Sequence, residues 1–186
     1  MPVTRHVRRV VSLALLTLLL SPISAGAHLE AQTDANDPGV LDIRKTSLNH
    51  KNGKIIHSVT TDGAWTAGTL AAEDGEDNKA NDNDIELLYE TKGDAAWDFL
   101  VLIDSEEGKL TASLYRWRAA TTKWVLVEGL GTPIKDGKTV KVKFAKGKID
   151  ASGSVNWHSS TFYTGGNCDL CKDYAPGFNE YWVHNL

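Results

Sequence analysis

The sequence predicts an all-β fold, a two-layer antiparallel β-sandwich of jelly-roll-like type, formed as a single domain after a signal peptide. Three observations support this prediction. Apolar and polar residues alternate with a period of two in several short segments. Turn-forming residues recur about every 8–12 residues between these segments. After the N-terminal segment, no long stretch has the spacing of an amphipathic helix.

The first 27 residues have the order of a secretory signal peptide. Arginines at positions 5, 8 and 9 precede the apolar run Val10–Leu20, and Ala25-Gly26-Ala27 follows as a small-x-small cleavage pattern. The alternative is a membrane-spanning helix, which needs roughly 20 apolar residues. This run is too short, and no later stretch is long and apolar enough. We therefore expect a secreted, extracellular protein that is not embedded in a membrane.

The rest of the chain consists of a polar lead-in followed by one domain. Residues 28–39 are polar and without periodicity, which predicts a flexible lead-in, and residues 40–186 are the expected β-sandwich domain. The full chain has 20 basic and 24 acidic residues. Because residues 1–27 contain three Arg and no acid, the remaining balance is 17 against 24, a net charge of −7. Such a charge disfavours nucleic-acid partners and is compatible with cations.

The stretch Trp97–Trp117 is the expected centre of the sandwich. It contains two apolar runs, Trp97–Asp104 and Lys109–Trp117, separated by a short polar segment that ends in Gly108. This pattern is typical of a β-hairpin. The first run has apolar residues on both of its faces, as in a strand that is covered on both sides.

The same alternation predicts the other strands. A hairpin is expected across Asn52-Gly53, between Val40–Leu48 and Lys54–Thr61. Further strands are expected at 84–90, 124–127, 139–144 and 154–163. Lysines alternate with apolar residues in 139–144, which suits a solvated or edge position. Eight or nine short strands result, without an internal repeat.

An acidic stretch between residues 62 and 83 is the strongest candidate for a metal site. Asp77, Asn81, Asp82 and Asp84 offer the carboxylate and amide oxygens that Ca²⁺ prefers. The spacing does not fit an EF-hand, because Leu87 stands where that loop needs glycine. We expect an irregular calcium site of the kind found on sandwich loops. The alternative is a solvated acidic loop.

Cys168 and Cys171 are the only cysteines, and we expect them to form a short disulfide. A redox role needs a cationic, thioredoxin-like setting, whereas Lys172 is the only cation beside the acids Asp169 and Asp173. A zinc site needs two further ligands. His158 and His184 are available, but their spacing matches no standard zinc finger.

Six tryptophans are many for a chain of this length. Trp97 and Trp157 alternate with inward residues and are expected in the core. Trp117 and Trp124 flank a short turn near Arg116, so these three residues are the expected ligand-binding surface. Exposed aromatic rings stack on the apolar faces of sugars. The alternative is ordinary packing between the sheets.

The sequence contains no H-E-x-x-H and no G-x-S-x-G motif. Asp98 with Asp104, or Glu86 with Glu90, are the candidate acid pairs for glycoside hydrolysis. Outward acids are also expected simply from strand alternation. Enzyme activity is therefore the less favoured class, and no catalytic residue is assigned.

Several segments resemble small secreted bacterial β-sandwich domains. They are Asp82–Glu86, the strand Trp97–Asp104, Gly108–Ala112, Val140–Phe144, the ending Cys-x-x-Cys-x-Asp-Tyr-Ala-Pro, and the terminal Val-His-Asn-Leu. The pattern is also similar, more loosely, to DOMON and family-9 carbohydrate-binding sandwiches. The resemblance implies a sandwich fold. The electron-transfer role of some DOMON domains is not carried over, because no haem-ligand pattern is found.

These observations together predict a secreted, non-catalytic binding or accessory module. Binding of Ca²⁺ by the acidic stretch would stabilise this module. Its expected partner is a glycan or a surface protein. One alternative is a small exported hydrolase with histidine and acidic residues at a loop-lined end of the sandwich. Another is a purely structural interaction domain.

Overall fold

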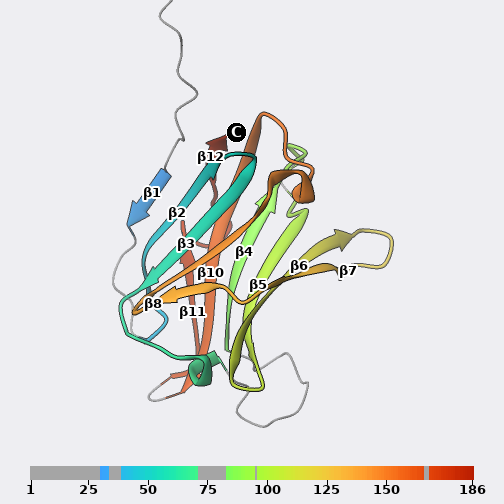
Figure 1. Cartoon of the computed structure of the whole chain (residues 1–186). Coiled ribbons are helices and arrows are strands. Elements are labelled where there is room, and N and C mark those ends of the chain that lie inside the picture. Colours follow the sequence, from blue (N-terminus) through green and yellow to red (C-terminus); the bar gives the residue numbers. More distant parts are fainter. Residues whose placement is uncertain (1–29, 34–38, 71–82, 95, 166–167) are drawn as a thin grey trace, which may run out of the picture.

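The computed structural model describes residues 30–33, 39–70, 83–94, 96–165 and 168–186 (Figure 1). Within these residues the chain forms twelve strands and two short 3₁₀ helices. The strands are β1 (Glu30–Thr33), β2 (Ile43–Lys51), β3 (Lys54–Thr61), β4 (Asp84–Glu90), β5 (Phe99–Glu106), β6 (Lys109–Arg118), β7 (Lys123–Gly131), β8 (Ile134–Asp136), β9 (Thr139–Ala145), β10 (Ser154–Gly165), β11 (Cys168–Ala175) and β12 (Trp182–Asn185). The 3₁₀ helices are η1 (Ala67–Leu70) and η2 (Lys146–Ile149).

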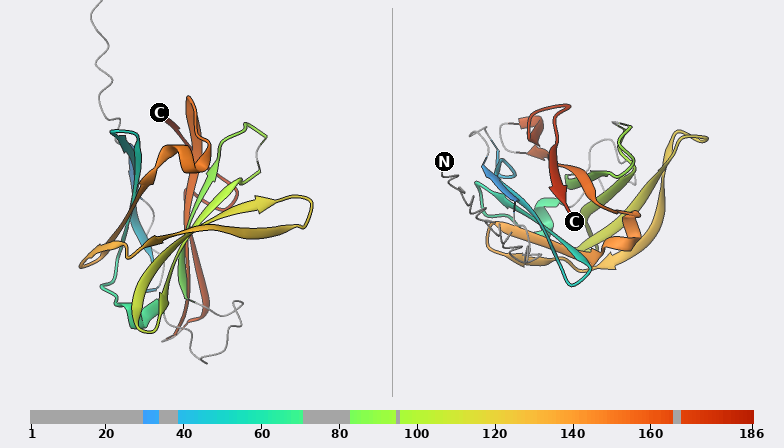
Figure 2. Two further views of the ribbon diagram at one scale, coloured as in Figure 1. Left: turned by 45° about the vertical axis from the view of Figure 1, so that its right-hand side comes forward. Right: turned by 90° about the horizontal axis from the view of Figure 1, so that it is seen from above.

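The strands form two antiparallel sheets that pack face to face (Figure 2). The first sheet has the order β1-β2-β3-β9-β8. The second has the order β11-β10-β4-β5-β6-β7, and β12 also pairs with β10. The chain changes sheet between β3 and β4, between β7 and β8, and between β9 and β10, while β4 to β7 form one meander. The predicted two-layer antiparallel sandwich is confirmed.

Strand β5 lies inside the second sheet, between β4 and β6, as its sequence predicts. On the face toward the first sheet it buries Phe99, Val101 and Ile103 completely. On the other face Leu100 is buried and Leu102 is half-buried. In β9 the apolar residues are buried and the lysines are exposed, because successive side chains of a strand point to opposite faces.

The hairpin between β2 and β3 turns at Asn52-Gly53, as predicted. Both residues have positive φ, 53° and 70°, which a tight two-residue hairpin turn requires. Lys51 pairs with Lys54 across this turn. The register that follows places alternate residues of β2 and β3 in the core.

A polar network crosses the core and joins the two sheets. His57 of β3 is fully buried, and its Nδ1 lies 2.8 Å from the hydroxyl of Tyr89 on β4. On the other side of the ring, Nε2 lies 2.9 Å from Oγ of Ser159 on β10. Ser159 Oγ in turn lies 2.8 Å from Oγ1 of Thr46, which donates to the carbonyl of Ser58. Buried polar groups of this kind are stable only when they are paired.

One set of proton positions satisfies every donor in this network. Tyr89 O–H donates to His57 Nδ1, Nε2–H donates to Ser159, Ser159 donates to Thr46, and Thr46 donates to the Ser58 carbonyl. This assignment needs a neutral imidazole, since Nδ1 must accept. Burial, followed by the nearby His158 and His184, lowers the pKa of His57 from 6.5 to about 3.

Tyr89→Phe is expected to destabilise the fold by about 1–3 kcal/mol, because it leaves the buried Nδ1 of His57 without a donor. Urea unfolding at pH 7 measures this difference. The matched control is Tyr115→Phe on β6, a half-buried tyrosine without a described hydrogen bond, which should change stability by less than about 0.5 kcal/mol. Equal effects of the two substitutions would contradict the assigned network.

The hairpin β6–β7 extends beyond the facing layer (Figure 1). Strand β7 is the last of its sheet, and three consecutive apolar residues on it, Val125, Leu126 and Val127, are 43%, 57% and 48% exposed. The sequence therefore places its apolar run 124–127 correctly as a strand, but the strand is not a core strand. It is exposed because the second sheet is wider than the first.

Three segments differ from the expectations of the sequence. Residues 30–33, inside the expected lead-in, form β1 by pairing with β2. Ile134–Asp136, expected as a connection, forms β8 beside β9. The expected tail contains two strands, β11 and β12. Both pair with β10, β12 with its first residues and β11 with the residues that follow. Each pairs through its backbone, which needs no apolar periodicity.

Among the described residues, the structure contains no helix that is both long enough and apolar enough to cross a membrane.

Candidate ligand-binding cavity

A cavity of about 280 Å³ lies beside the ends of β4 and β10. It is lined by Glu90, Trp97, Asn156, Asn179 and Tyr181. Its volume is just below the roughly 300–1,000 Å³ that is usual for small-molecule sites. These residues come from four separate parts of the chain: the end of β4, the approach to β5, strand β10, and the loop between β11 and β12.

The floor of the cavity is a cross-strand pair. Glu90 and Asn156 are direct partners in the β4–β10 register. Asn156 Nδ2 donates to Glu90 Oε2 over 2.6 Å. Both residues belong to the alternating set of β4 and β10 that points away from the core, since their neighbours Tyr89 and Trp157 are fully buried inside it. The floor is therefore on the outer face of the second sheet.

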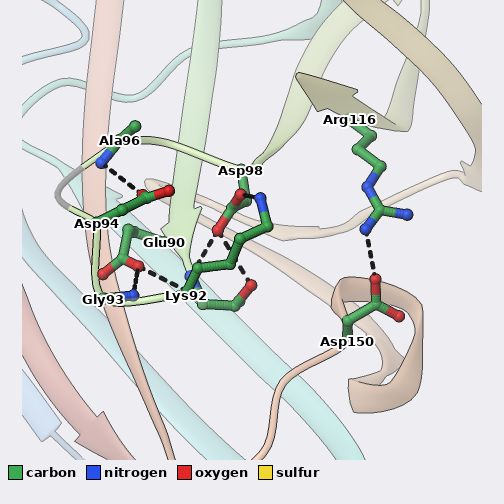
Figure 3. A network of polar contacts seen from close by, with 9 residues as sticks. Glu90, Lys92, Gly93, Asp94, Ala96, Asp98, Arg116 and Asp150 are labelled. Carbon is green, nitrogen blue, oxygen red and sulfur yellow. Dashed lines mark hydrogen bonds and ion pairs between the residues drawn. The ribbon is translucent and has the colours of Figure 1, made fainter. Parts of the chain in front are cut away.

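The carboxylate of Glu90 is held by the turn that follows β4. Its Oε1 accepts from the backbone N–H of Lys92 over 2.7 Å, and also from the N–H of Gly93 (Figure 3). Gly93 has a φ of 75°, which allows this turn. With the bond from Asn156, three N–H groups use three of about four acceptor positions on the carboxylate. Glu90 is only 3% exposed.

The side chain of Asp98 bonds to residues at the start of the segment between β4 and β5. These bonds hold the position of the neighbouring Trp97. Asp98 Oδ2 accepts from the backbone N–H of Thr91 over 2.9 Å and from its hydroxyl over 3.1 Å. Its Oδ1 pairs with the ammonium of Lys92. The backbone of Asp98 continues the ladder, donating to the carbonyl of Tyr89. These bonds place the residue before Asp98 at the cavity.

Trp97 is the aromatic wall on this side, and the prediction that it belongs to the core is wrong. It is half-buried and precedes the first residue of β5, so strand alternation does not fix its direction. Its ring lies against His158 on the outer face, with centroids 5.7 Å apart. Trp157 is fully buried, as predicted.

His158 supports both sides of the cavity. Its Nδ1–H donates to the carbonyl of Glu180 over 3.0 Å, which ties β10 to the loop that contains Asn179 and Tyr181. Burial lowers the pKa of His158, and the bond to the Glu180 carbonyl acts in the opposite direction. A neutral imidazole at neutral pH therefore packs between the Trp97 wall and this loop.

The opposite rim is exposed to solvent. Tyr181 is 48% exposed, and Asn179 has a left-handed φ of 64° inside the turn in which Glu180 N–H donates to the Gly177 carbonyl. The cavity thus combines two aromatic side chains, two amides and one carboxylate. This combination is suited to a small ligand with both apolar faces and hydroxyl or amino groups.

Glu90, Asp94 and Asp98 have oxygens within 4.8 Å of one another, the spacing of a metal site. Their described bonds are to the chain itself: Glu90 and Asp98 accept as above, and Asp94 accepts from the N–H of Ala96 (Figure 3). Lys92 already supplies a positive charge at Asp98. We interpret the cluster as the support of the 91–98 segment.

The predicted acid pairs for hydrolysis do not meet. Glu86 and Glu90 are four residues apart on one strand, or about 13 Å, against roughly 5–9.5 Å for glycosidase pairs. Asp98, just before β5, and Asp104, within β5, are six residues apart and therefore further apart still. Glu86 bonds to the hydroxyl of Ser160 over 3.2 Å, and burial raises its pKa. These pairs therefore do not form a hydrolytic site.

A serine–histidine pair does exist, between Ser159 and His57, but both residues are 0% exposed and neither lines the cavity. Because no substrate reaches them, this pair stabilises the core and does not supply an accessible nucleophile. Catalytic residues of the expected alternative, a loop-end hydrolase, are not found in this pair.

The predicted ligand surface on the β6–β7 hairpin is partly assembled. Trp117 and Trp124 are register partners, and their rings meet edge to face at 5.4 Å and 66°. Trp117 is 36% exposed and Trp124 is half-buried. Arg116 is directed elsewhere: its Nη2 lies 2.7 Å from Asp150, and its guanidinium lies over Phe99. The ligand role of these three residues stays a prediction.

The predicted calcium ligands Asp77, Asn81 and Asp82 lie outside the described residues. Asp84, the fourth, is the first residue of β4 and is half-buried. Calcium binding by this set stays a prediction. The same holds for the disulfide, because the side chain of Cys168 is outside the described part, while Cys171 belongs to β11.

The sequence did not select Asn156, Asn179 or Tyr181, and it offered Glu90 only as a member of an acid pair. No local motif joins these residues, since 91 positions separate the first from the last. Only the pairing of β10 with β4 brings Asn156 to Glu90. The cavity became apparent only from the register of the strands.

Comparison with protein-family models, with curated proteins and with solved structures finds no match. The resemblance to DOMON and family-9 carbohydrate-binding sandwiches therefore stays a prediction.

Proposed function

We propose that this protein is an exported, non-catalytic binding module that holds one sugar ring in the cavity between Trp97 and Tyr181. The observation that supports this most strongly is the lining itself, which combines two aromatic side chains with one carboxylate and two amides. Aromatic rings contact the apolar C–H face of a sugar. Carboxylates accept from its hydroxyls, and amides both accept from them and donate to them.

The size and position of the cavity favour recognition of a single ring. A volume of about 280 Å³ is small for an oligosaccharide chain. The exposed rim at Tyr181 and Asn179 leaves room for the rest of a glycan to extend into solvent. Binding is favoured over cleavage because Glu90 is the one carboxylate in the lining, and glycoside hydrolysis ordinarily needs two.

A glycan array followed by isothermal titration of the strongest ligand tests the proposal. Tyr181→Ala is expected to weaken that ligand by about tenfold, since one aromatic contact is worth roughly 1–1.5 kcal/mol. The matched control is Phe178→Ala on the same loop, a 69% exposed ring that does not line the cavity, which should leave binding unchanged. An array without any binding, or equal losses in the two variants, would refute the proposed site.

A further inference from the structure

We propose that the ligand of this cavity is an amino sugar, a hexosamine ring whose ammonium group pairs with Glu90. This inference rests on the proposed sugar-binding function and names the class of sugar. It starts from a buried carboxylate that faces the cavity without a described positive partner.

Glu90 is 97% buried by its neighbours, yet its three described donors are all uncharged N–H groups, from the backbone of Lys92 and Gly93 and from the amide of Asn156. The ammonium of Lys92 is paired with Asp98 instead. Buried carboxylates are usually paired with a cation, since desolvation of an unpaired charge is costly. A cationic ligand in the cavity would supply that partner.

The acidic residues around the cavity also favour a cationic ligand. Asp94 and Asp98 have oxygens within 4.8 Å of the Glu90 carboxylate or of each other, and Glu180 lies between the two lining residues of the rim. Lys92 supplies one positive charge to this group, at Asp98. A concave site with an excess of one sign concentrates ligands of the opposite sign.

The aromatic walls are compatible with such a cation. Trp97 and Tyr181 line the same cavity as Glu90. A cation near the face of a tryptophan or tyrosine is attracted by the electrons of the ring. An uncharged sugar would gain the C–H contact alone, whereas an aminated ring gains both contacts.

The two amides favour a hydroxylated ring over a quaternary ammonium compound. Asn156 uses one N–H for Glu90, and its remaining N–H and its oxygen have no described partner. Asn179 is a second amide in the lining, and it is exposed. A sugar offers hydroxyls to both amides and an N–H to the fourth acceptor position of Glu90, whereas a quaternary ammonium offers no donor at all.

Titration of the full exported chain with four small probes tests this. The probes are methyl glucosaminide, methyl N-acetylglucosaminide, methyl glucoside and tetramethylammonium. Protein NMR at pH 6.5 and low salt measures the binding of each. We expect methyl glucosaminide to bind at least tenfold more tightly than the acetylated and the neutral sugar, because a charge-assisted bond exceeds a neutral one. The preference should fall as salt is added.

Glu90→Gln should abolish this preference without abolishing the site. The new oxygen still accepts from Lys92 and Gly93, and the new amide N–H can donate to a flipped Asn156, so the floor keeps its bonds. Glu106→Gln at the exposed end of β5 is the matched control and should keep the wild-type preference. If Glu90→Gln does not fold, Asp94→Asn, which is exposed, should still reduce the preference severalfold.

The outcomes separate this inference from the proposed function. Equal or tighter binding of the acetylated or neutral sugar would overturn the amino-sugar assignment and leave sugar binding standing. Tighter binding of tetramethylammonium than of any sugar would overturn the assignment to a hydroxylated ring. Absence of binding by all four probes, together with an array without any binding, would overturn the proposed function as well.

Discussion

Trp97→Ala is expected to weaken sugar binding by at least about tenfold while the protein stays folded. The ring forms one wall of the cavity, and alanine leaves no apolar face for the sugar to contact. The fold should tolerate the change because Trp97 is half-buried and outside the core, and because its neighbour Asp98 keeps the backbone ladder through Tyr89. Isothermal titration measures the affinity, and circular dichroism verifies the fold.

Trp117→Ala is the matched control, since Trp117 is the exposed tryptophan of the other candidate surface. We expect wild-type affinity for this variant. A loss confined to Trp117→Ala would assign the ligand to the β6–β7 hairpin, as the sequence alone predicts, and would contradict the cavity. The two substitutions therefore distinguish the two candidate surfaces with the same chemical change.

Acidification from pH 7 to pH 4 is expected to destabilise the fold steeply through His57. Its pKa is about 3 in the folded protein, against an ordinary value of 6.5. Between these values the unfolded chain binds a proton that the folded chain does not, so the contribution of His57 to stability is complete above about pH 6.5 and is lost as the pH falls. The expected slope is a little over 1 kcal/mol per pH unit in this window.

Other groups titrate in the same range, so the slope is measured against His57→Gln. His158, whose pKa is also lowered by burial, acts in the same direction. Glu86 acts in the opposite direction because burial raises its pKa. Urea unfolding at several pH values gives the change of the unfolding free energy with pH. In His57→Gln this slope should be smaller by about the contribution of one proton. Parallel slopes in the two proteins would show that His57 does not contribute to acid sensitivity.

The strands that alternation predicts well are those whose inward residues are all apolar. Strand β9 has only valine and phenylalanine on its inner face, and β5 has phenylalanine, valine and isoleucine. In both, burial of the apolar face is the main reason for the strand, so the sequence pattern contains the information.

The strands that alternation missed bury polar residues or are held by their backbone. Strand β11 directs Asp173 inward, where it accepts from the backbone N–H of Ile43 on the other sheet. Strand β10, which the sequence does predict over 154–163, also directs polar residues into the core: Ser159 bonds to Thr46, and Thr161 donates to the carbonyl of Leu41. In the sequence, an inward polar residue interrupts the apolar alternation and so suggests a loop. In the fold, a partner on another strand makes its burial stable.

The site was less predictable than the fold because its residues are neighbours only in the sheet. Alternation predicts Trp97 in the core, yet the strand begins two residues later. Tyr181 and Asn179 come from a loop whose position depends on the bond between Glu180 and His158. Such long-range contacts leave no local pattern, whereas the paired tryptophans of a hairpin do.

The most direct test of the account is a ¹⁵N–¹H NMR titration of the protein with methyl glucosaminide. We predict that the largest shift changes occur at the indole N–H of Trp97, the side-chain amides of Asn156 and Asn179, and the backbone of Lys92 and Gly93, which hold the Glu90 carboxylate. Changes centred on Trp117 and Trp124, or no change at saturating sugar, would contradict the account.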